Sequence, residues 1–318
     1  MKKPWTPQEV TFLIRERANG VRNAAIAREL QRPLASVENK ARHLVSAGHM
    51  SNASGTRGFL QTVNKYEPPE EPNFDGFLEL QGDFISVSDV HVPFWKIELF
   101  ERLFSVARKF KIKLLIINGD FLNMDAFSRW PTANKGRDHM ETEFTKADYV
   151  LGKCLKVFDK IVITMGNHEE RLFKSLLGQI NPERFFKMLH TEISTTKHPK
   201  KNAKVQVSDY PYCIVNGKWL VGHPAGFSGR GGSMPADIAD KYEMNVILGH
   251  NHQYGVQMSL SGKYQGIDQG MGADGLKVEY SQKSLNKYRT WQNGFTMVKN
   301  NYAYPFNLRF TDWDFWLK

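Results

Sequence analysis

The stretch Gly166-Asn167-His168-Glu169 directly follows an apolar run at residues 161–164, and four similar junctions occur along the chain. At each junction, a short apolar run of the kind that forms a buried strand ends in side chains that bind metal ions. In an open α/β sheet, ligands bind just beyond the carboxyl ends of the strands, so the junctions predict one shared site. The other four are Asp89-Val90-His91, Gly119-Asp120, Gly222-His223 and Gly249-His250-Asn251-His252.

The apolar runs also predict the fold class of the larger part of the chain. Helical patterns at residues 97–110 and 145–158 separate the first three runs, and this alternation indicates stacked α/β layers. The five predicted strands are residues 84–87, 114–117, 161–164, 219–221 and 246–248.

The N-terminal segment has helical patterns only. Thr6-Pro7-Gln8-Glu9 is a helix start with a capping box, and a second helix fits residues 21–30. Ser36 is expected to open a third helix after the break at Gln31-Arg32-Pro33. Three short helices predict a helix-turn-helix module. We therefore divide the chain into this module at residues 1–48, a proline-rich linker at residues 49–75, and an α/β domain at residues 76–318.

The charge distribution suggests a partner for the module. The formal net charge is +10, and residues 1–60 hold ten Lys or Arg against four acids, which is +6. This excess favours a polyanion, nucleic acid first, although a solvated face on a protein-interaction module is the alternative. Residues 5–44 also resemble Myb/SANT-like and resolvase-type DNA-binding domains. The third helix would present to DNA Ser36, Asn39, Lys40, Arg42 and His43.

The ligand types at the five junctions fit two divalent cations. Hard carboxylate oxygens and several imidazoles are what such ions require, and Asp120 is the candidate bridge between them. Mn²⁺ is the expected metal, with Fe or Zn as alternatives. The first ion is assigned to Asp89, His91 and His252, and the second to Asn167, His223 and His250.

The ordered junctions resemble the calcineurin-like metallophosphoesterase superfamily over residues 84–267. The resemblance implies a four-layered α/β/β/α sandwich in which His168 faces the leaving group instead of the metals. Gly166-Asn167-His168-Glu169-Glu170-Arg171-Leu172 and residues 291–295 are most similar to bacteriophage and prophage members. Protein phosphatases of the superfamily read Gly-Asp-x-x-Asp-Arg-Gly, but here Asn123 replaces the second acid and the Arg-Gly is missing, which argues against a phosphoprotein substrate.

The expected reaction is hydrolysis of a phosphate ester, most plausibly a DNA phosphodiester. A hydroxide held between two cations would attack phosphorus, and His168 would protonate the leaving oxygen. Arg129, Arg171 and Asn123 are candidates for phosphate contacts. Two alternatives stay open: a phosphomonoesterase or small-molecule phosphodiesterase whose module only localises it, and a DNA-binding regulator with an inactive core.

Composition constrains the location and leaves the assembly open. No stretch has the roughly 18 apolar residues that a membrane span needs, and no apolar core of a signal peptide follows Lys2 and Lys3. Cys154 and Cys213 are expected to be reduced, buried thiols, so we expect a cytoplasmic protein. The aromatic segment 306–318 is expected to pack on the core or on a second subunit, and the oligomeric state is undetermined.

Overall fold

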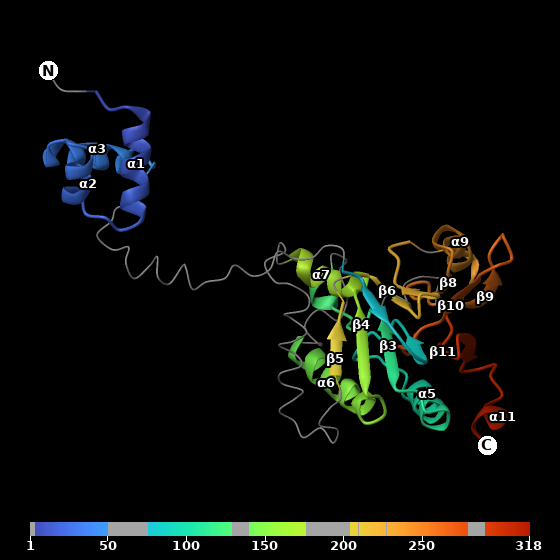
Figure 1. Cartoon of the computed structure of the whole chain (residues 1–318). Helices are drawn as coiled ribbons and strands as arrows, with labels where there is room; N and C mark the ends of the chain where they lie inside the picture. Colours follow the sequence, from blue (N-terminus) through green and yellow to red (C-terminus); the bar gives the residue numbers. More distant parts are fainter. Residues whose placement is uncertain are drawn as a thin grey trace. The chain divides into compact units, whose positions relative to one another are not determined.

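A computed structural model describes residues 4–49, 76–128, 140–175, 204–208, 210–226, 228–278 and 290–318. The chain separates into two compact units, residues 1–75 and residues 76–318 (Figure 1). Almost all of the predicted linker, residues 49–75, lies outside the described residues. None of the described helices is long and apolar enough to cross a membrane.

The first unit contains three helices, α1 (Pro7–Ala18), α2 (Asn23–Glu29) and α3 (Leu34–Ser46). The capping box at the start of α1 is present, with Thr6 and Glu9 bonding reciprocally. The third helix begins at Leu34, so the predicted start at Ser36 is wrong. Extended Pro33 already supplies the carbonyl that accepts from the N–H of Ser36, which places Ser36 inside the first turn. The helices bury a small core of Leu13, Ile26, Ala27, Val37, Ala41 and Leu44.

Arg32 ties the turn before α3 back to the start of α1. Its guanidinium contacts the Glu9 carboxylate at 2.9 Å and donates to the Pro4 carbonyl at 2.6 Å. It also lies 4.4 Å from the centre of the Trp5 ring. Hydrogen bonds from Arg32 lower the pKa of Glu9 to about 2. Because Arg32 is 8% exposed and fully engaged, this cation is a structural anchor and not part of a nucleic-acid surface.

The second unit contains two six-stranded sheets. In sheet order, the first comprises β1 (Leu78–Leu80), β6 (Tyr212–Val215), β7 (Trp219–Gly222), β8 (Asn245–Leu248), β10 (Gln265–Gln269) and β9 (Tyr254–Met258). The second comprises β12 (Tyr302–Asn307), β11 (Gly294–Lys299), β2 (Phe84–Val87), β3 (Leu114–Asn118), β4 (Lys160–Thr164) and β5 (Lys204–Val207). Strands β2, β3, β4 and β5 are parallel neighbours, so their carboxyl ends share one edge.

Helices cover the outer face of each sheet. The helices of this unit are α5 (Ile97–Phe110), the 3₁₀ turn η1 (Asp125–Phe127), α6 (Met140–Leu155), α7 (Asn167–Ser175), α9 (Ser233–Tyr242) and α11 (Trp313–Leu317). Along β2, Ile85 packs in the cluster under α5 and α6, whereas Phe84 faces the core between the sheets. Helix α9 covers β7 and β8 on the other side. The order helix, sheet, sheet, helix confirms the predicted four-layered sandwich.

The predicted strands all form, with ends within one residue of those observed. Helix α5 has the predicted bounds, but the predicted helix at 145–158 is displaced, because α6 ends at Leu155 and the chain turns before β4. Only some of the aromatic side chains near the C-terminus are packed. Trp313 and Trp316 pack against the core, whereas Phe310 and Phe315 are 70% and 75% exposed.

Candidate metal centre

The predicted ligands follow strands of both sheets. Asp89 and His91 follow β2, and Asp120 follows β3. Asn167 begins α7 just after β4, His223 follows β7, and His250 and His252 follow β8. The metal centre is therefore assembled from loops at the carboxyl ends of strands, the position that α/β sheets use for ligands.

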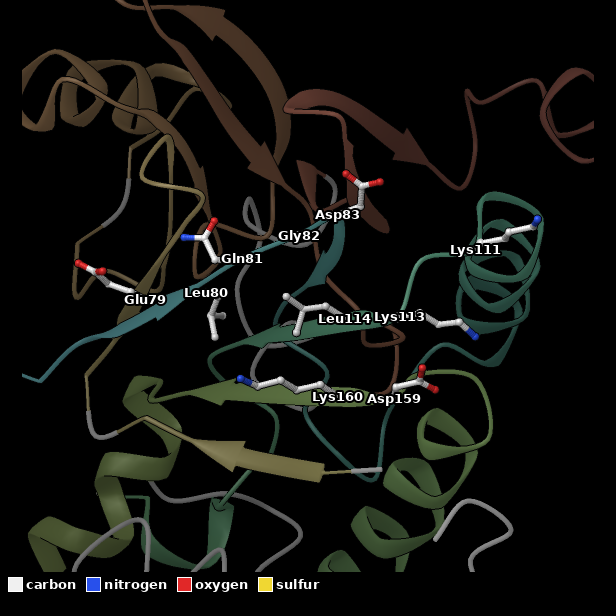
Figure 2. Close-up of a pocket in the computed structure, with 10 residues that line it drawn as sticks. All are labelled: Glu79, Leu80, Gln81, Gly82, Asp83, Lys111, Lys113, Leu114, Asp159 and Lys160. Atoms are coloured by element: carbon white, nitrogen blue, oxygen red, sulfur yellow. The ribbon is translucent and has the colours of Figure 1, made fainter. Parts of the chain in front are cut away.

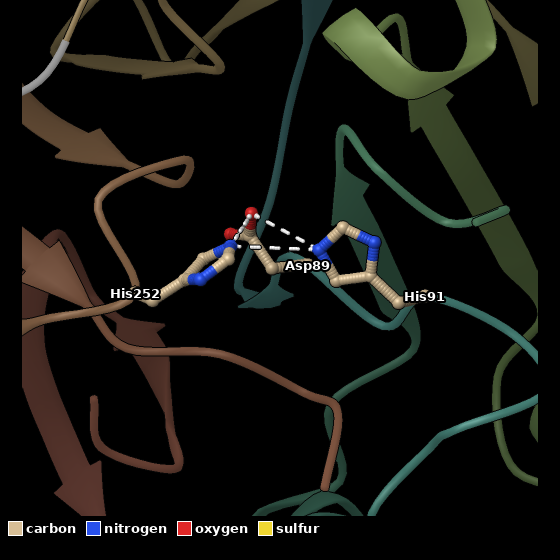
Figure 3. Close-up of side chains that lie close together, drawn as sticks. All are labelled: Asp89, His91 and His252. Carbon is tan, nitrogen blue, oxygen red and sulfur yellow. Dashed lines mark hydrogen bonds and ion pairs between the residues drawn. The ribbon is translucent and has the colours of Figure 1, made fainter. Parts of the chain in front are cut away.

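Asp89, His91 and His252 form the first group, and all three are buried. In Figure 3 the three side chains point toward one another. His252 Nε2 lies 2.9 Å from Asp89 Oδ1 and 3.4 Å from His91 Nε2. His91 Nε2 lies 3.9 Å from Asp89 Oδ1. One carboxylate oxygen and two imidazole nitrogens thus converge on one point.

Asp120, His223 and His250 form the second group. His223 Nε2 lies 3.3 Å from Asp120 Oδ2 and 3.3 Å from Asn167 Oδ1. Asp120 Oδ2 is also 4.0 Å from His91 Nε2, which belongs to the first group. Asp120 therefore lies where the two groups meet, as a shared ligand must.

His168 forms a third such group with His91 and Asp120, where the first two groups meet. Its Nε2 is 3.8 Å from Asp120 Oδ2, and its Nδ1 is 2.6 Å from the Asn123 carbonyl. Arg171 Nη2 is 2.7 Å from the same Nε2. A guanidinium can only donate, so Nε2 accepts from it and Nδ1 donates to Asn123. In this state the ring is neutral and holds no proton on Nε2.

The ligand loops have an unusual backbone. Five of the predicted ligands have positive φ, between 43° and 75°. Residues other than glycine adopt this left-handed conformation rarely and at a cost, so a cluster of them marks a site whose geometry the surrounding structure imposes. They are Asp89, His91, Asp120, His250 and His252.

Buried carboxylates hold these loops in place by accepting hydrogen bonds from their backbone N–H groups. Glu169 accepts hydrogen bonds from the N–H groups of Asp120, Leu122 and Gly166, at 2.7 to 3.1 Å. Glu143 accepts from the N–H groups of Asn123 and Met124. Asp268 accepts from Gly232 N–H and from the Asn251 side chain.

None of these three acids is among the predicted ligands, and Glu169 belongs to the stretch Gly166-Asn167-His168-Glu169. Glu143 carried a usable signal, since it shares the buried face of α6 with Ala147, Val150 and Leu151 at helical spacing. An acid on an apolar face indicates a buried partner. Asp268 directly follows Ile267 on the short strand β10. Nothing in that sequence indicates that its side chain is buried or has a partner.

The buried carboxylates and imidazoles of the site shift one another's pKa. Burial acts to raise the pKa of Asp120, but His168 and His223 hold it well below its ordinary value. Burial lowers the pKa of His168 to about 4, and Arg171 adds to this. Burial also acts to lower the pKa of His223, yet Asp120 and Asp89 outweigh it and raise that pKa to about 10.

The residues present fit two divalent cations. Buried carboxylates and imidazoles gather with their ligand atoms within 4.8 Å of one another in each group. Several nitrogen atoms face one another or a carboxylate oxygen at contact distance, an arrangement that cations between them would stabilise. The two groups would hold one ion each, with Asp120 between them. The identity of the metal is not fixed by this donor set.

The candidate phosphate contacts differ in whether they lie at the metal site. Asn123 is buried, and its carbonyl accepts from His168 and Arg171. Arg171 lies against His168 at the site, whereas Arg129 lies outside the described residues. The candidate DNA contacts belong to the other unit. On α3, Asn39, Arg42 and His43 are exposed, while Ser36 and Lys40 are partly exposed.

A hollow of about 490 Å³ lies at the opposite ends of the same strands. Asp83 precedes β2, Lys113 precedes β3 and Asp159 precedes β4 (Figure 2), whereas the metal ligands follow the other ends of these strands. Its six charged side chains balance and none is buried. They are Glu79, Asp83, Asp159, Lys111, Lys113 and Lys160. Nothing there matches the interlocked ligands at the other end.

Comparison with known proteins shows which family has a domain that covers this site. A family model described as calcineurin-like phosphoesterase matches residues 83–255, more than half of the chain. Among solved structures, vacuolar protein sorting 29 from Cryptosporidium parvum is similar over 71% of this chain and 96% of its own, with 11% identity and a TM-score of 0.34. At that TM-score it does not bear on function, and a comparison with curated proteins found no match. The match over residues 83–255 contains all the predicted ligands, and the chain belongs to the calcineurin-like phosphoesterase family.

Proposed function

We propose that this chain is a two-metal phosphodiesterase that cleaves DNA. The hydrolytic part of the proposal rests on one observation, the Asp120 carboxylate lying between two groups of Asp and His ligands, all of them buried except the half-buried His250. Two divalent ions held there would activate a water molecule and neutralise the charge that develops on the phosphate oxygens. The identity of these ions as Mn²⁺ is part of the proposal.

The protein's own residues orient the reacting groups. Asp120 Oδ1 accepts from the His168 backbone N–H at 2.9 Å, which fixes His168 at the start of α7 beside the ligands. The Asn123 carbonyl fixes the ring through Nδ1. We propose that Nε2 faces the oxygen of the leaving group. It can pass a proton to that oxygen only after Arg171 releases it and the neutral ring takes up a second proton from solvent at Nε2.

The preference for DNA rests on the first unit. The basic excess of residues 1–60 and the exposed polar side chains of α3 suit phosphates and base edges. A module of this kind raises the local concentration of its polymer at a tethered active site. The alternative function is that of a phosphomonoesterase or small-molecule phosphodiesterase. It predicts instead that the first unit has no effect on turnover.

The test is a substrate panel with matched variants. The Mn²⁺-loaded full chain is assayed on duplex DNA, single-stranded DNA, bis(p-nitrophenyl) phosphate and p-nitrophenyl phosphate. The double variant Lys40→Ala/Arg42→Ala should raise KM for DNA and lower its salt dependence by about two charges, without changing hydrolysis of the nitrophenyl diester. Arg15→Ala, which removes a cation paired with Glu16 on α1, is the control. Hydrolysis of the nitrophenyl esters with no cleavage of either DNA would refute the DNA proposal.

A further inference from the structure

Arg171 lies one helical turn beyond His168 on α7, so the two side chains share a face of the helix. Three contacts place its guanidinium. Nη2 lies 2.7 Å from His168 Nε2, and Nη1 lies 3.2 Å from the Asn123 carbonyl and 3.4 Å from Asp125 Oδ1.

The guanidinium is only partly used by these contacts. It carries five N–H donors, and the three acceptors engage at most three of them. Nε–H and one Nη2–H have no acceptor among the described residues. The Arg171 side chain is 23% exposed, whereas that of His168 is 5% exposed. Arg171 is therefore a cation with spare donors on the solvent side of a buried site.

Asp125 holds this cation in place. Asp125 Oδ1 pairs with Arg171, while its Oδ2 accepts from the Asn123 side chain at 2.6 Å. The ion pair is long at 3.4 Å, and Asp125 is also 23% exposed. A phosphate oxygen forms shorter, charge-assisted bonds to a guanidinium, often two at once, and would compete well for the same donors.

We infer that Arg171 is a specificity residue that binds a second phosphate group of the substrate, next to the leaving group of the phosphate being cleaved. The inference rests on the proposed function in one respect, since it takes His168 to face the leaving group. Arg171 reaches the ligand cluster through His168, and no contact among the described residues joins it directly to Asp120. Its guanidinium is thus placed for a neighbouring phosphate more than for one bound at Asp120.

The position also links recognition to reaction. A second phosphate that draws Nη2 away from His168 leaves Nε2 open toward the leaving oxygen. A substrate without that phosphate leaves Arg171 on Nε2. Polynucleotides carry a phosphate on either side of each ester, so they satisfy this requirement, and simple phosphodiesters do not.

The test measures binding to the Mn²⁺-loaded full chain by isothermal titration calorimetry. The ligands are thymidine 3′,5′-bisphosphate, thymidine 5′-monophosphate and thymidine 3′-monophosphate. The bisphosphate should bind roughly tenfold more tightly than either monophosphate. Arg171→Gln should remove that preference, and Arg171→Lys, which keeps the charge but not the fork, should retain part of it. Lys174→Gln is the control, because Lys174 is an exposed cation on the same helix, paired with Glu170.

Two results would overturn the inference. One is a wild-type protein with no preference for the bisphosphate. The other is an Arg171→Gln protein that loses affinity equally for all three ligands, which would assign Arg171 to the phosphate at the metals or to holding His168. These measurements need no DNA cleavage. A retained bisphosphate preference with no cleavage of DNA would refute the proposed function and leave the assignment of Arg171 standing.

Discussion

The carboxyl ends and the amino ends of strands β2, β3 and β4 both carry clusters of charge, held in different ways. At the carboxyl ends, Asp89 and Asp120 are buried and bonded to backbone N–H groups of other loops. At the amino ends, Lys113 and Asp159 stand exposed around a hollow of about 490 Å³. The hollow is mixed in charge, and its Asp83 also accepts a hydrogen bond from a backbone N–H. Burial, more than the gathering of charge or a single bond to the backbone, therefore distinguishes the reactive end.

Among substitutions at the two ends of the strands, Asp120→Asn at the carboxyl ends should lower activity most. Asp120→Asn removes the charge shared by the two ligand groups, so the protein should fail to hold two metals. Loss of several kcal/mol of transition-state stabilisation corresponds to about 10³-fold in rate. Metal analysis of the purified variant, together with its rate on bis(p-nitrophenyl) phosphate, measures both effects. A variant with two bound metals and near-normal turnover would show that Asp120 is not the bridge.

Two glycines give a matched pair across the sheet. Gly119 and Gly82 both have positive φ, at 72° and 107°. A Cβ at Gly119 would collide with the His223 ring, whereas one at Gly82 meets nothing within 4 Å. Gly119→Ala should lower kcat by about 10²-fold, because small displacements of catalytic groups have such effects.

Gly82→Ala is the control, because it also places an alanine at positive φ and should cost stability while leaving turnover unchanged. Thermal melts and kcat on the nitrophenyl diester separate the two variants. Equal losses of activity would mean that strain alone, and not contact with His223, accounts for the effect at Gly119.

Glu143 offers a gentler test of the reactive end. Glu143→Gln weakens the acceptor for the N–H groups of Asn123 and Met124, which displaces the Asn123 carbonyl that orients His168. We expect about a tenfold fall in kcat with both metals retained, as is typical for groups that orient catalytic residues indirectly. Glu141→Gln, an exposed acid in the same first turn of α6, should have no effect. Loss of metal from Glu143→Gln would instead give Glu143 a role in holding the ligands.

The smallest effect is expected at the amino ends. Lys113→Ala removes an exposed cation from the hollow, and turnover should stay within about twofold of wild type. Stopped assays on DNA and on the nitrophenyl diester check this. A selective loss on DNA would show that the hollow contributes to substrate binding, and the contrast between the two ends would have to be redrawn.

The ligands themselves were accessible from the sequence for a physical reason. Each follows a strand whose apolar run is short and unambiguous, and parallel strands bring their carboxyl ends to one edge. Asp89 and Asp120 follow the neighbouring strands β2 and β3, so their meeting could be predicted in this way. His223 follows β7 of the other sheet and meets Asp120 only because the two sheets stack. The capping box of Thr6 and Glu9 was equally readable, because both partners lie within four residues.

Other features depend on contacts that no local pattern encodes. The bond from Arg171 to His168 Nε2 requires knowing which way a helix face points after the turn at Gly166. Arg32 looked like one more cation in a basic segment, but its partner Glu9 lies 23 residues away. The start of α3 was misplaced because Ser36 is a good cap, while Pro33 had already supplied the extended residue and the carbonyl.

The left-handed backbone at five ligands has a consequence for how this protein can change over generations. Each such residue costs on the order of 1–2 kcal/mol relative to a relaxed conformation, and glycine removes most of that cost. Replacing His250, the half-buried ligand among them, with glycine would therefore remove a metal ligand while relieving backbone strain in the metal-free fold. Selection for turnover must continually oppose this drift. Where that selection lapses, the sandwich outlives its reaction and becomes available as an inert scaffold.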